Sequence, residues 1–140
     1  MSILVDSSVL LDILTDDPVW ASWSEEKLSS LGREQQLVIN DIVWSECSVA
    51  FKRIEVYGQI IARMGFLHRQ IPKEALFLAA KIFVTYRKAG GIKTAPLPDF
   101  FIGAHAAVEG MTLLTRGPKR MRTHFPRLKL ICPDAPRASE

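Results

Sequence analysis

The stretch ILVDSSVLLDIL, residues 3–14, places a short apolar run directly before an acidic residue and a helical pattern. Ile3 to Val5 contain no polar side chain, which is typical of a strand buried in a parallel sheet. The run stops at Asp6, and Ser7 can cap the helix that the next apolar residues predict. Parallel sheets of this kind bind ligands beyond the carboxyl ends of their strands. Asp6 is therefore expected at such an edge, either as a ligand-binding carboxylate or only as a helix cap.

The rest of the chain repeats this alternation of short apolar runs and amphipathic helices. Further strands are predicted at 37–39, 112–115 and 128–131, and helices at roughly 18–32, 41–54, 56–66, 73–88 and 99–109. Strands separated by helices of this length favour an α/β fold with a short, mainly parallel sheet. We expect one domain over residues 1–133, a three-layer α/β/α sandwich, and a frayed tail at 134–140.

The composition is that of an ordinary globular domain. Of 140 residues, 48% are hydrophobic and 24% are charged, a balance that excludes a globally disordered chain. No apolar run is long enough to span a membrane, and the N-terminus has no basic leader typical of a signal peptide. Cys47 and Cys132 are the two cysteines and imply no disulfide framework. We therefore expect a cytoplasmic protein with no membrane partner.

Basic residues cluster near the C-terminus, although the net charge is only +3. Residues 116–129 contain no acid, and their sequence, RGPKRMRTHFPRLK, is rich in Arg and Lys. Such a segment is either a solvated loop with an edge strand or a rim that contacts nucleic-acid phosphates. In the second case, the residues expected to contact phosphates are Arg116, Lys119, Arg120 and Arg122.

Two more carboxylates stand at unusual places in the pattern. Glu46 shares a helix face with Ile42 and Ala50, and an unpaired charge in an apolar stripe is costly. The alternative is that Glu46 reaches water or pairs with Arg53. Asp99 precedes an apolar helical run, where it is either a cap or a ligand at the edge of the sheet.

Asp6, Glu46 and Asp99 come from distant parts of the sequence and could converge on one spot. Carboxylates brought together repel one another, and a bound cation relieves that repulsion. Oxygen ligands without His or Cys companions suit Mg²⁺ or Mn²⁺ rather than Zn²⁺. His105, among alanines on its helix, is expected to be a packed histidine and not a base. The residues thus indicate metal-assisted cleavage of phosphodiester bonds.

Four segments carry a family resemblance: VDSSVLLDIL at 5–14, VWSE at 43–46, PDFFIGAHA at 98–106, and LLTR at 113–116 followed by FPRLKLI. Together they resemble the PIN-domain ribonucleases, and within these the VapC-type toxins of bacterial type II toxin–antitoxin systems. The resemblance covers the chain from Ile3 to about Pro133. It implies a Mg²⁺- or Mn²⁺-dependent endoribonuclease that cuts tRNA, rRNA or mRNA. It also implies inhibition by a VapB antitoxin, contact with operator DNA only through that antitoxin, and a homodimer.

The resemblance also assigns roles to single residues. Asp6, Glu46 and Asp99 match the first three family acids, which bind the metal and carry catalysis. Thr115 matches a Ser/Thr position near the metal, and Ser7 matches the small hydroxyl residue after the first Asp. We expect a metal-bound water to attack the scissile phosphorus, with Arg116 or Lys119 assisting electrostatically.

Gly117 departs from the family pattern, because the family commonly has a fourth acid at this position. The missing carboxylate should weaken metal binding, and the glycine is either natural or a detoxifying change. Two functions follow: an active ribonuclease toxin, or a catalytically impaired PIN protein that binds RNA or antitoxin and represses its own operon. A structure-specific DNA nuclease is a third reading, against which the short chain counts.

Aromatic residues raise the question of a partner groove. Trp20, Trp23 and Phe51 either complete the core or line a groove for an antitoxin helix. Gly103 is expected to let its helix approach a strand closely. In the helix at 73–88, the residues expected to face the core are Leu76, Ala79, Ala80, Phe83 and Val84.

Overall fold

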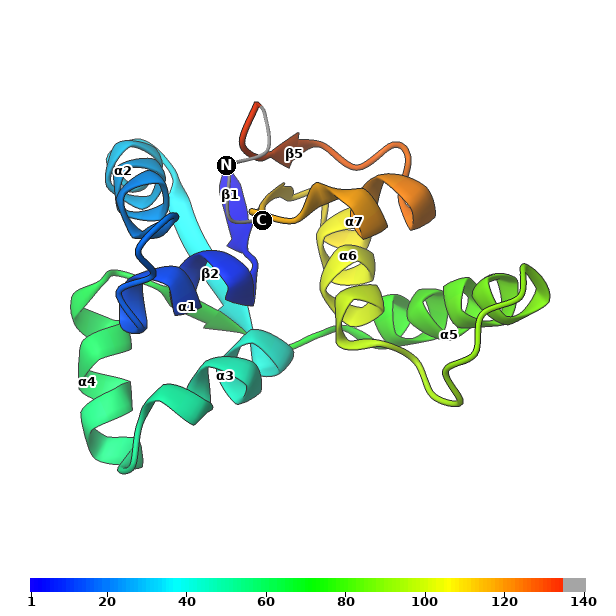
Figure 1. The fold of residues 1–140 in the computed structure, drawn as a ribbon, viewed down its shortest axis with the longest axis horizontal. Helices are drawn as coiled ribbons and strands as arrows, with labels where there is room; N and C mark the ends of the chain where they lie inside the picture. Colours follow the sequence, from blue (N-terminus) through cyan, green and yellow to red (C-terminus); the bar gives the residue numbers. More distant parts are fainter. Residues whose placement is uncertain (135–140) are drawn as a thin grey trace.

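A computed structural model describes residues 1–134, so most of the tail expected at 134–140 lies outside the described residues. Within this range the strands form one sheet in the order β3-β2-β1-β4-β5, and every neighbouring pair is parallel (Figure 1). The strands are β1 (Ser2–Val5), β2 (Gln36–Asn40), β3 (Leu67–Arg69), β4 (Thr112–Leu114) and β5 (Leu130–Ile131). The predicted parallel sheet is confirmed.

Helices cover both faces of this sheet. Figure 1 shows α1 and α2 on one side of the strands and α6 and α7 on the other, which confirms the three-layer α/β/α arrangement. The helices are α1 (Ser7–Leu14), α2 (Ala21–Gly32), α3 (Asp41–Cys47), α4 (Ile54–Arg63), α5 (Lys73–Lys88), α6 (Pro98–Glu109) and α7 (Pro118–His124), with a 3-10 turn at Ser48–Ala50. No helix among the described residues is long and apolar enough to cross a membrane.

The central strands explain where the functional residues lie. Ile3, Leu4 and Val5 are at most 1% exposed, as their uninterrupted apolar run predicts. Val5 lies opposite Leu114 in the sheet register. The residues that follow these two strands therefore emerge side by side at the carboxyl edge of the sheet.

The structure differs from the sequence prediction at β3, at α7 and at the end of α3. Strand β3 was not predicted, because its sequence LHR has no apolar run and two of its residues are exposed. Residues 118–124 were expected to be turn and loop, but they form α7 with Pro118 at its first position, where a proline costs no hydrogen bond. The helix predicted at 41–54 ends at Cys47, and Phe51 is already extended.

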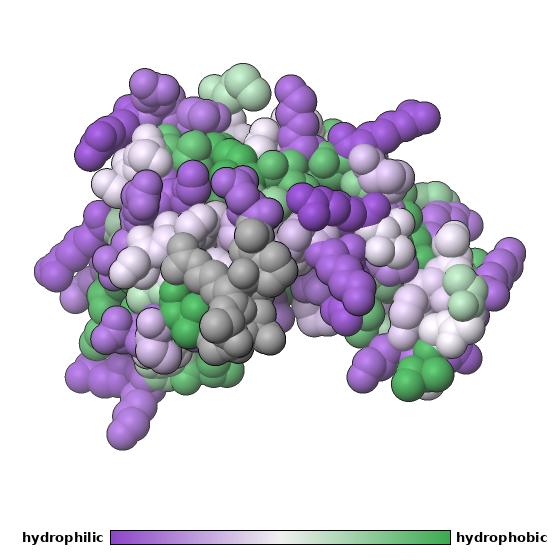
Figure 2. Space-filling view, turned by 45° about the horizontal axis from the view of Figure 1, so that its top comes forward, coloured by the Kyte–Doolittle hydropathy of each residue, from purple (hydrophilic) through white to green (hydrophobic). Residues whose placement is uncertain are grey.

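The core prediction for α5 was also partly wrong. Ala75 and Ala79 are the buried residues of this helix, whereas Leu76 and Val84 are 42% and 46% exposed. Phe77 is 65% exposed on the same helix. Figure 2 shows a face of the molecule on which hydrophobic side chains gather in groups between hydrophilic ones. The fold therefore buries only part of the apolar stripe that was expected on α5.

Trp20 and Gly103 both lie at tightly packed places in the fold. Trp20 is 3% exposed and belongs to the core, whereas Trp23 and Phe51 are only partly buried against it. A Cβ atom on Gly103 would come within 2.4 Å of the Phe125 ring. The close approach therefore involves the residue that follows α7, and not a strand as expected.

Candidate active site

Asp6 lies at the carboxyl edge of the sheet, directly after β1. Its backbone N–H donates to the carbonyl oxygen of Leu114 over 2.9 Å, and the residue is only 6% exposed. Although Asp6 occupies the N-cap position of α1, its side chain makes no capping hydrogen bond. Its oxygen Oδ2 instead accepts hydrogen bonds from the hydroxyls of Thr115 (2.7 Å) and Ser8 (3.2 Å). Helix capping is therefore not the role of this carboxylate.

The environment of Asp6 opposes its negative charge. Burial raises the pKa of the Asp6 carboxyl, and the negative charge of Asp99 raises it further. The hydrogen bonds from Thr115 and Ser8 lower the pKa and only partly compensate. The ionised form of Asp6 would therefore be stabilised by a nearby cation.

Glu46 reaches the same edge from α3. The Asn40 side chain caps this helix by accepting a hydrogen bond from the Val43 N–H over 3.0 Å. Glu46 Oε1 accepts a hydrogen bond from the Ser7 hydroxyl over 2.8 Å. Arg53 instead lies 3.6 Å from Glu55, so the alternative that it pairs with Glu46 is wrong.

The pKa of Glu46 is also raised above its ordinary value. Burial is the main cause, and the hydrogen bond from Ser7 opposes it. The charges of Asp6 and Asp99 raise the pKa of Glu46 as well. Residues from three separate elements thus act on one another electrostatically.

Asp99 lies in the first turn of α6, whose N-cap position belongs to Leu97. The capping alternative for Asp99 is therefore wrong. The carboxylate is about one third exposed, and its Oδ2 accepts a hydrogen bond from Arg120 Nη1 over 2.9 Å. Arg120, expected to contact RNA phosphates, is thus ion-paired within the chain.

The acidic side chains fit a hard divalent cation in their chemistry. They offer only oxygen donors, and Asp6 and Glu46 form no ion pair with Lys or Arg anywhere in residues 1–134. As the side chains stand, no three acidic, His or Cys residues in this part of the chain lie close enough to hold a metal ion. Asp6, Glu46 and Asp99 are therefore near enough to repel one another, but as they stand they are too far apart to bind one ion together.

Ser7 and Thr115 both contact the acids, as the resemblance implied. Besides its bond to Glu46, the Ser7 hydroxyl lies 3.5 Å from Asp6 Oδ1. Thr115 Oγ1 donates to Asp6 and accepts a hydrogen bond from the Gly117 N–H over 3.1 Å. The Thr115 hydroxyl thus orients Asp6, and the Ser7 hydroxyl orients Glu46.

Gly117 has room for a side chain. It precedes α7 with a φ of −115°, which any residue can adopt, and a Cβ atom would meet nothing within 4 Å. Neither the backbone nor the packing thus requires glycine here.

Two residues near the site were missed. Ser8 bonds to Asp6, and Asp12, on the buried face of α1, pairs with Arg116. Asp12 interrupts the apolar run VLLDIL, and this interruption was the signal that could have found it. Arg116, expected to contact RNA phosphates, thus forms an ion pair inside the chain.

The basic helix α7 borders an open cleft next to Asp99. The cleft has a volume of about 530 Å³ and is lined by Asp99, Gly117, Lys119, Arg120, Thr123 and His124. Lys119 and Arg122, the other two expected phosphate contacts, are exposed. This side of the site combines one acid with several cations.

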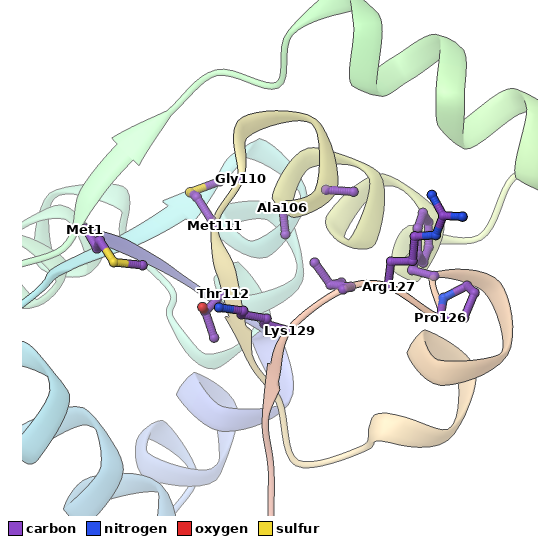
Figure 3. A pocket seen from close by; sticks show the side chains of 11 residues that line it. Met1, Ala106, Gly110, Met111, Thr112, Pro126, Arg127 and Lys129 are labelled. Carbon is purple, nitrogen blue, oxygen red and sulfur yellow. The ribbon is translucent and has the colours of Figure 1, made fainter.

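A second pocket, of about 570 Å³, lies away from the acids. Figure 3 shows Met1, Thr112 and Lys129 beside it; Thr112 is the first residue of β4, and Met1 and Lys129 directly precede β1 and β5. The pocket therefore opens at the amino edge of the sheet.

His105, a packed histidine as expected, is buried and hydrogen-bonds to Asn40 Nδ2 over 3.1 Å and to Glu109.

The chain matches the family model of the PIN domain over residues 3–125. One similar structure is that of VapBC2 from Rickettsia felis, bound to a promoter DNA fragment. The two chains are 19% identical with a TM-score of 0.74, and the match covers 96% of this chain and 100% of that chain. VapBC-1 from nontypeable Haemophilus influenzae is 17% identical, with a TM-score of 0.68 and coverages of 94% and 98%. A toxin–antitoxin complex from Klebsiella pneumoniae is 21% identical, with a TM-score of 0.67 and coverages of 92% and 95%. These similarities establish a shared fold, and no curated protein matches the chain.

Proposed function

The chain belongs to the PIN-domain family, and we propose that it is a metal-dependent endoribonuclease toxin of the VapC type. The observation that carries this proposal is the placement of Asp6 after β1, Glu46 on α3 and Asp99 on α6, near enough that the charge of Asp99 raises the pKa of both other acids. A divalent cation would remove the repulsion between these charges. The similar structures are described as VapBC or toxin–antitoxin complexes, which supports a toxin in particular.

In this proposal, Asp6, Glu46 and Asp99 hold one Mg²⁺ or Mn²⁺ ion. When bound, the ion supplies a Lewis acid for the scissile phosphate and a water of lowered pKa. Thr115 and Ser7 keep the carboxylates in place through the hydrogen bonds that they donate. The substrate is RNA, a tRNA, rRNA or mRNA.

RNA would enter along the cleft beside α7. Lys119 lines this cleft and Arg122 lies on the same helix, so both can approach phosphates. Arg120 is half exposed and lines the cleft together with Asp99, so it is available to a phosphate once Asp99 binds a cation. Such contacts lose strength as salt is added.

The proposed partners are a VapB-type antitoxin and a second copy of the chain, in the cytoplasm. The antitoxin would silence the enzyme and carry it to operator DNA. The Rickettsia felis complex was solved on a DNA fragment from its promoter, which supports this last step.

A second candidate function is binding without cleavage, and Gly117 favours it. A PIN protein that lacks one acid could retain its RNA and antitoxin contacts while cleaving poorly. Since position 117 has open space, restoring a carboxylate there tests this directly.

The test is a nuclease assay on antitoxin-free protein. Wild type, Gly117→Asp and Gly117→Asn are incubated with total RNA in Mn²⁺, Mg²⁺ or EDTA. We expect discrete cuts by wild type that are lost in EDTA and in Asp6→Asn, and faster cutting by Gly117→Asp. Gly117→Asn, which adds the same bulk without charge, should match wild type. If only Gly117→Asp cuts, the chain is a disarmed toxin. If all folded variants are inactive, the binding function replaces the proposal.

A further inference from the structure

A partly buried ion pair joins Asp12 of α1 to Arg116, whose side chain is 29% exposed, and the proposed function assigns this pair no role. Asp12 is 2% exposed, and Arg116 Nε lies 3.1 and 2.9 Å from its two carboxylate oxygens. The Ser24 hydroxyl donates to the same carboxylate over 2.9 Å. A buried carboxylate that loses its cation is strongly destabilising, so Asp12 determines where the Arg116 side chain lies.

Arg116 is attached to α1 through its backbone as well. It belongs to segment 115–117, which joins β4 to α7, and its N–H donates to Ser8 Oγ over 3.3 Å. Its guanidinium also lies over the Trp20 ring, 5.7 Å from the ring centre. The backbone of Arg116 is therefore held by α1, and its side chain is held by α1 and by Trp20, which directly precedes α2.

The same segment carries the hydrogen bonds to Asp6. Thr115 and Ser8 both donate to Asp6 Oδ2, over 2.7 and 3.2 Å. The Gly117 N–H donates to the Thr115 hydroxyl over 3.1 Å, which orients that hydroxyl. A continuous chain of contacts thus runs from Asp12 through Arg116 to one oxygen of Asp6.

We propose that Asp12 and Arg116 are positioning residues for Asp6. Their ion pair holds segment 115–117 against α1, so that two hydroxyls fix Asp6 Oδ2. Oδ1, whose contact with the Ser7 hydroxyl is 3.5 Å long, is then left to a divalent cation. The inference rests on the proposed function, because it takes Asp6 as a metal ligand. It gives Arg116 a role different from the RNA contact expected from its place in the basic segment.

The first test measures Mn²⁺ affinity by calorimetry without RNA. Asp12→Asn and Arg116→Gln break the ion pair, whereas Ser24→Ala removes a hydrogen bond from the same carboxylate and leaves the pair intact. We expect both pair variants to weaken Mn²⁺ binding about tenfold, as is typical when a residue that orients a metal ligand is lost, and Ser24→Ala to change it less than about twofold. The double variant should be no weaker than either single one.

The second test follows the geometry in metal-free protein by amide hydrogen exchange. The Gly117 and Arg116 amides should exchange faster in Asp12→Asn and Arg116→Gln, and as in wild type in Ser24→Ala. This measurement separates the two claims: a wild type that binds no Mn²⁺ contradicts the proposed function, while exchange still tests the positioning role. If Asp12→Asn does not fold, the double variant removes both charges and carries the same expectation.

Three results would overturn the inference. The first is unchanged Mn²⁺ affinity in folded pair variants of a chain that binds Mn²⁺. The second is unchanged exchange at Gly117. The third is an Arg116→Gln variant whose RNA affinity becomes less salt-dependent while its Mn²⁺ affinity stays the same, since that pattern defines a phosphate contact.

Discussion

At the scale of the residue, the site depends on carboxylates placed where their charge is unfavourable. Asp6 combines burial with the negative field of Asp99, and its hydrogen bonds from Thr115, Ser8 and the Ser7 backbone only partly compensate. Such a placement lowers the stability of the free protein. Such a placement is typical of functional sites, where ligand binding compensates for the lost stability.

This placement predicts how stability depends on pH. Because the pKa of Asp6 is higher in the folded than in the unfolded chain, the folded state binds more protons between the two values. Asp6 therefore makes the metal-free protein less stable as pH rises through that window, and the loss persists at neutral pH. Asp6→Asn should raise Tm in EDTA at pH 7 by a few degrees and show no such gain well below the ordinary pKa of Asp.

Thermal unfolding of both proteins across a pH series checks this. Their difference isolates Asp6 from other groups such as Asp17, whose pKa is lowered by hydrogen bonds from the backbone of Trp20 and Val19. A variant that is less stable than wild type at every pH would contradict the account.

At the scale of the element, α7 is positioned by one close contact. The Phe125 ring, just beyond the end of α7, packs against the backbone of α6 at Gly103. Figure 1 shows the two helices next to each other. This contact places the basic helix, and with it Arg120, beside Asp99.

Gly103→Ala should therefore destabilise the fold by about 1–3 kcal/mol, the usual cost of overpacking. Its Cβ would lie 2.4 Å from the Phe125 ring. Gly58→Ala in α4 is the matched control, because a Cβ there meets nothing within 4 Å. The control should gain about 0.5–1 kcal/mol from the better helix propensity of alanine. Urea denaturation measures both, and equal effects at the two sites would refute the packing argument.

The elements that could be predicted from the sequence are those with a strong local signal. β1 follows from its apolar run, and Asp6 follows from its place after that run. β3 was missed because its sequence LHR has no apolar run, and α7 was missed because its sequence resembles a basic turn. Their identity depends on neighbours that are distant in the sequence.

The same limit applies to the site. Asp6, Glu46 and Asp99 could be selected because each is a charge at a place that favours an apolar residue or a cap. The pair of Asp12 with Arg116 spans 104 positions, and no local pattern indicates it. The basic composition of segment 116–129 predicts Arg120 as a phosphate contact, but it could not predict that the fold also pairs Arg120 with Asp99.

At the scale of the whole molecule, charge is distributed unevenly although the net charge is only +3. Lys119 and Arg120 of α7 line one cleft with Asp99, so RNA phosphates and a metal ion would be bound by adjacent surfaces. The rest of the surface carries both signs of charge. RNA affinity should therefore depend on a few cations near the cleft.

Lys119→Gln should weaken RNA binding and reduce the slope of log affinity against log salt by about 0.7, the value for one phosphate contact to a single strand. Lys27→Gln, in α2 on the other side of the strands (Figure 1), is the control and should leave the slope unchanged. The measurement is RNA binding in EDTA at several salt concentrations. Equal slopes for wild type and Lys119→Gln would place the RNA elsewhere.

The most direct measurement of the central claim is a calorimetric Mn²⁺ titration of the wild-type chain and Asp6→Asn at several pH values. We predict saturable binding that Asp6→Asn abolishes. The affinity should fall as pH is lowered, because the raised pKa values of Asp6 and Glu46 make protons compete with the ion. Absence of Mn²⁺ binding by the folded wild type, or binding that Asp6→Asn leaves unchanged, would contradict a metal site at this edge of the sheet.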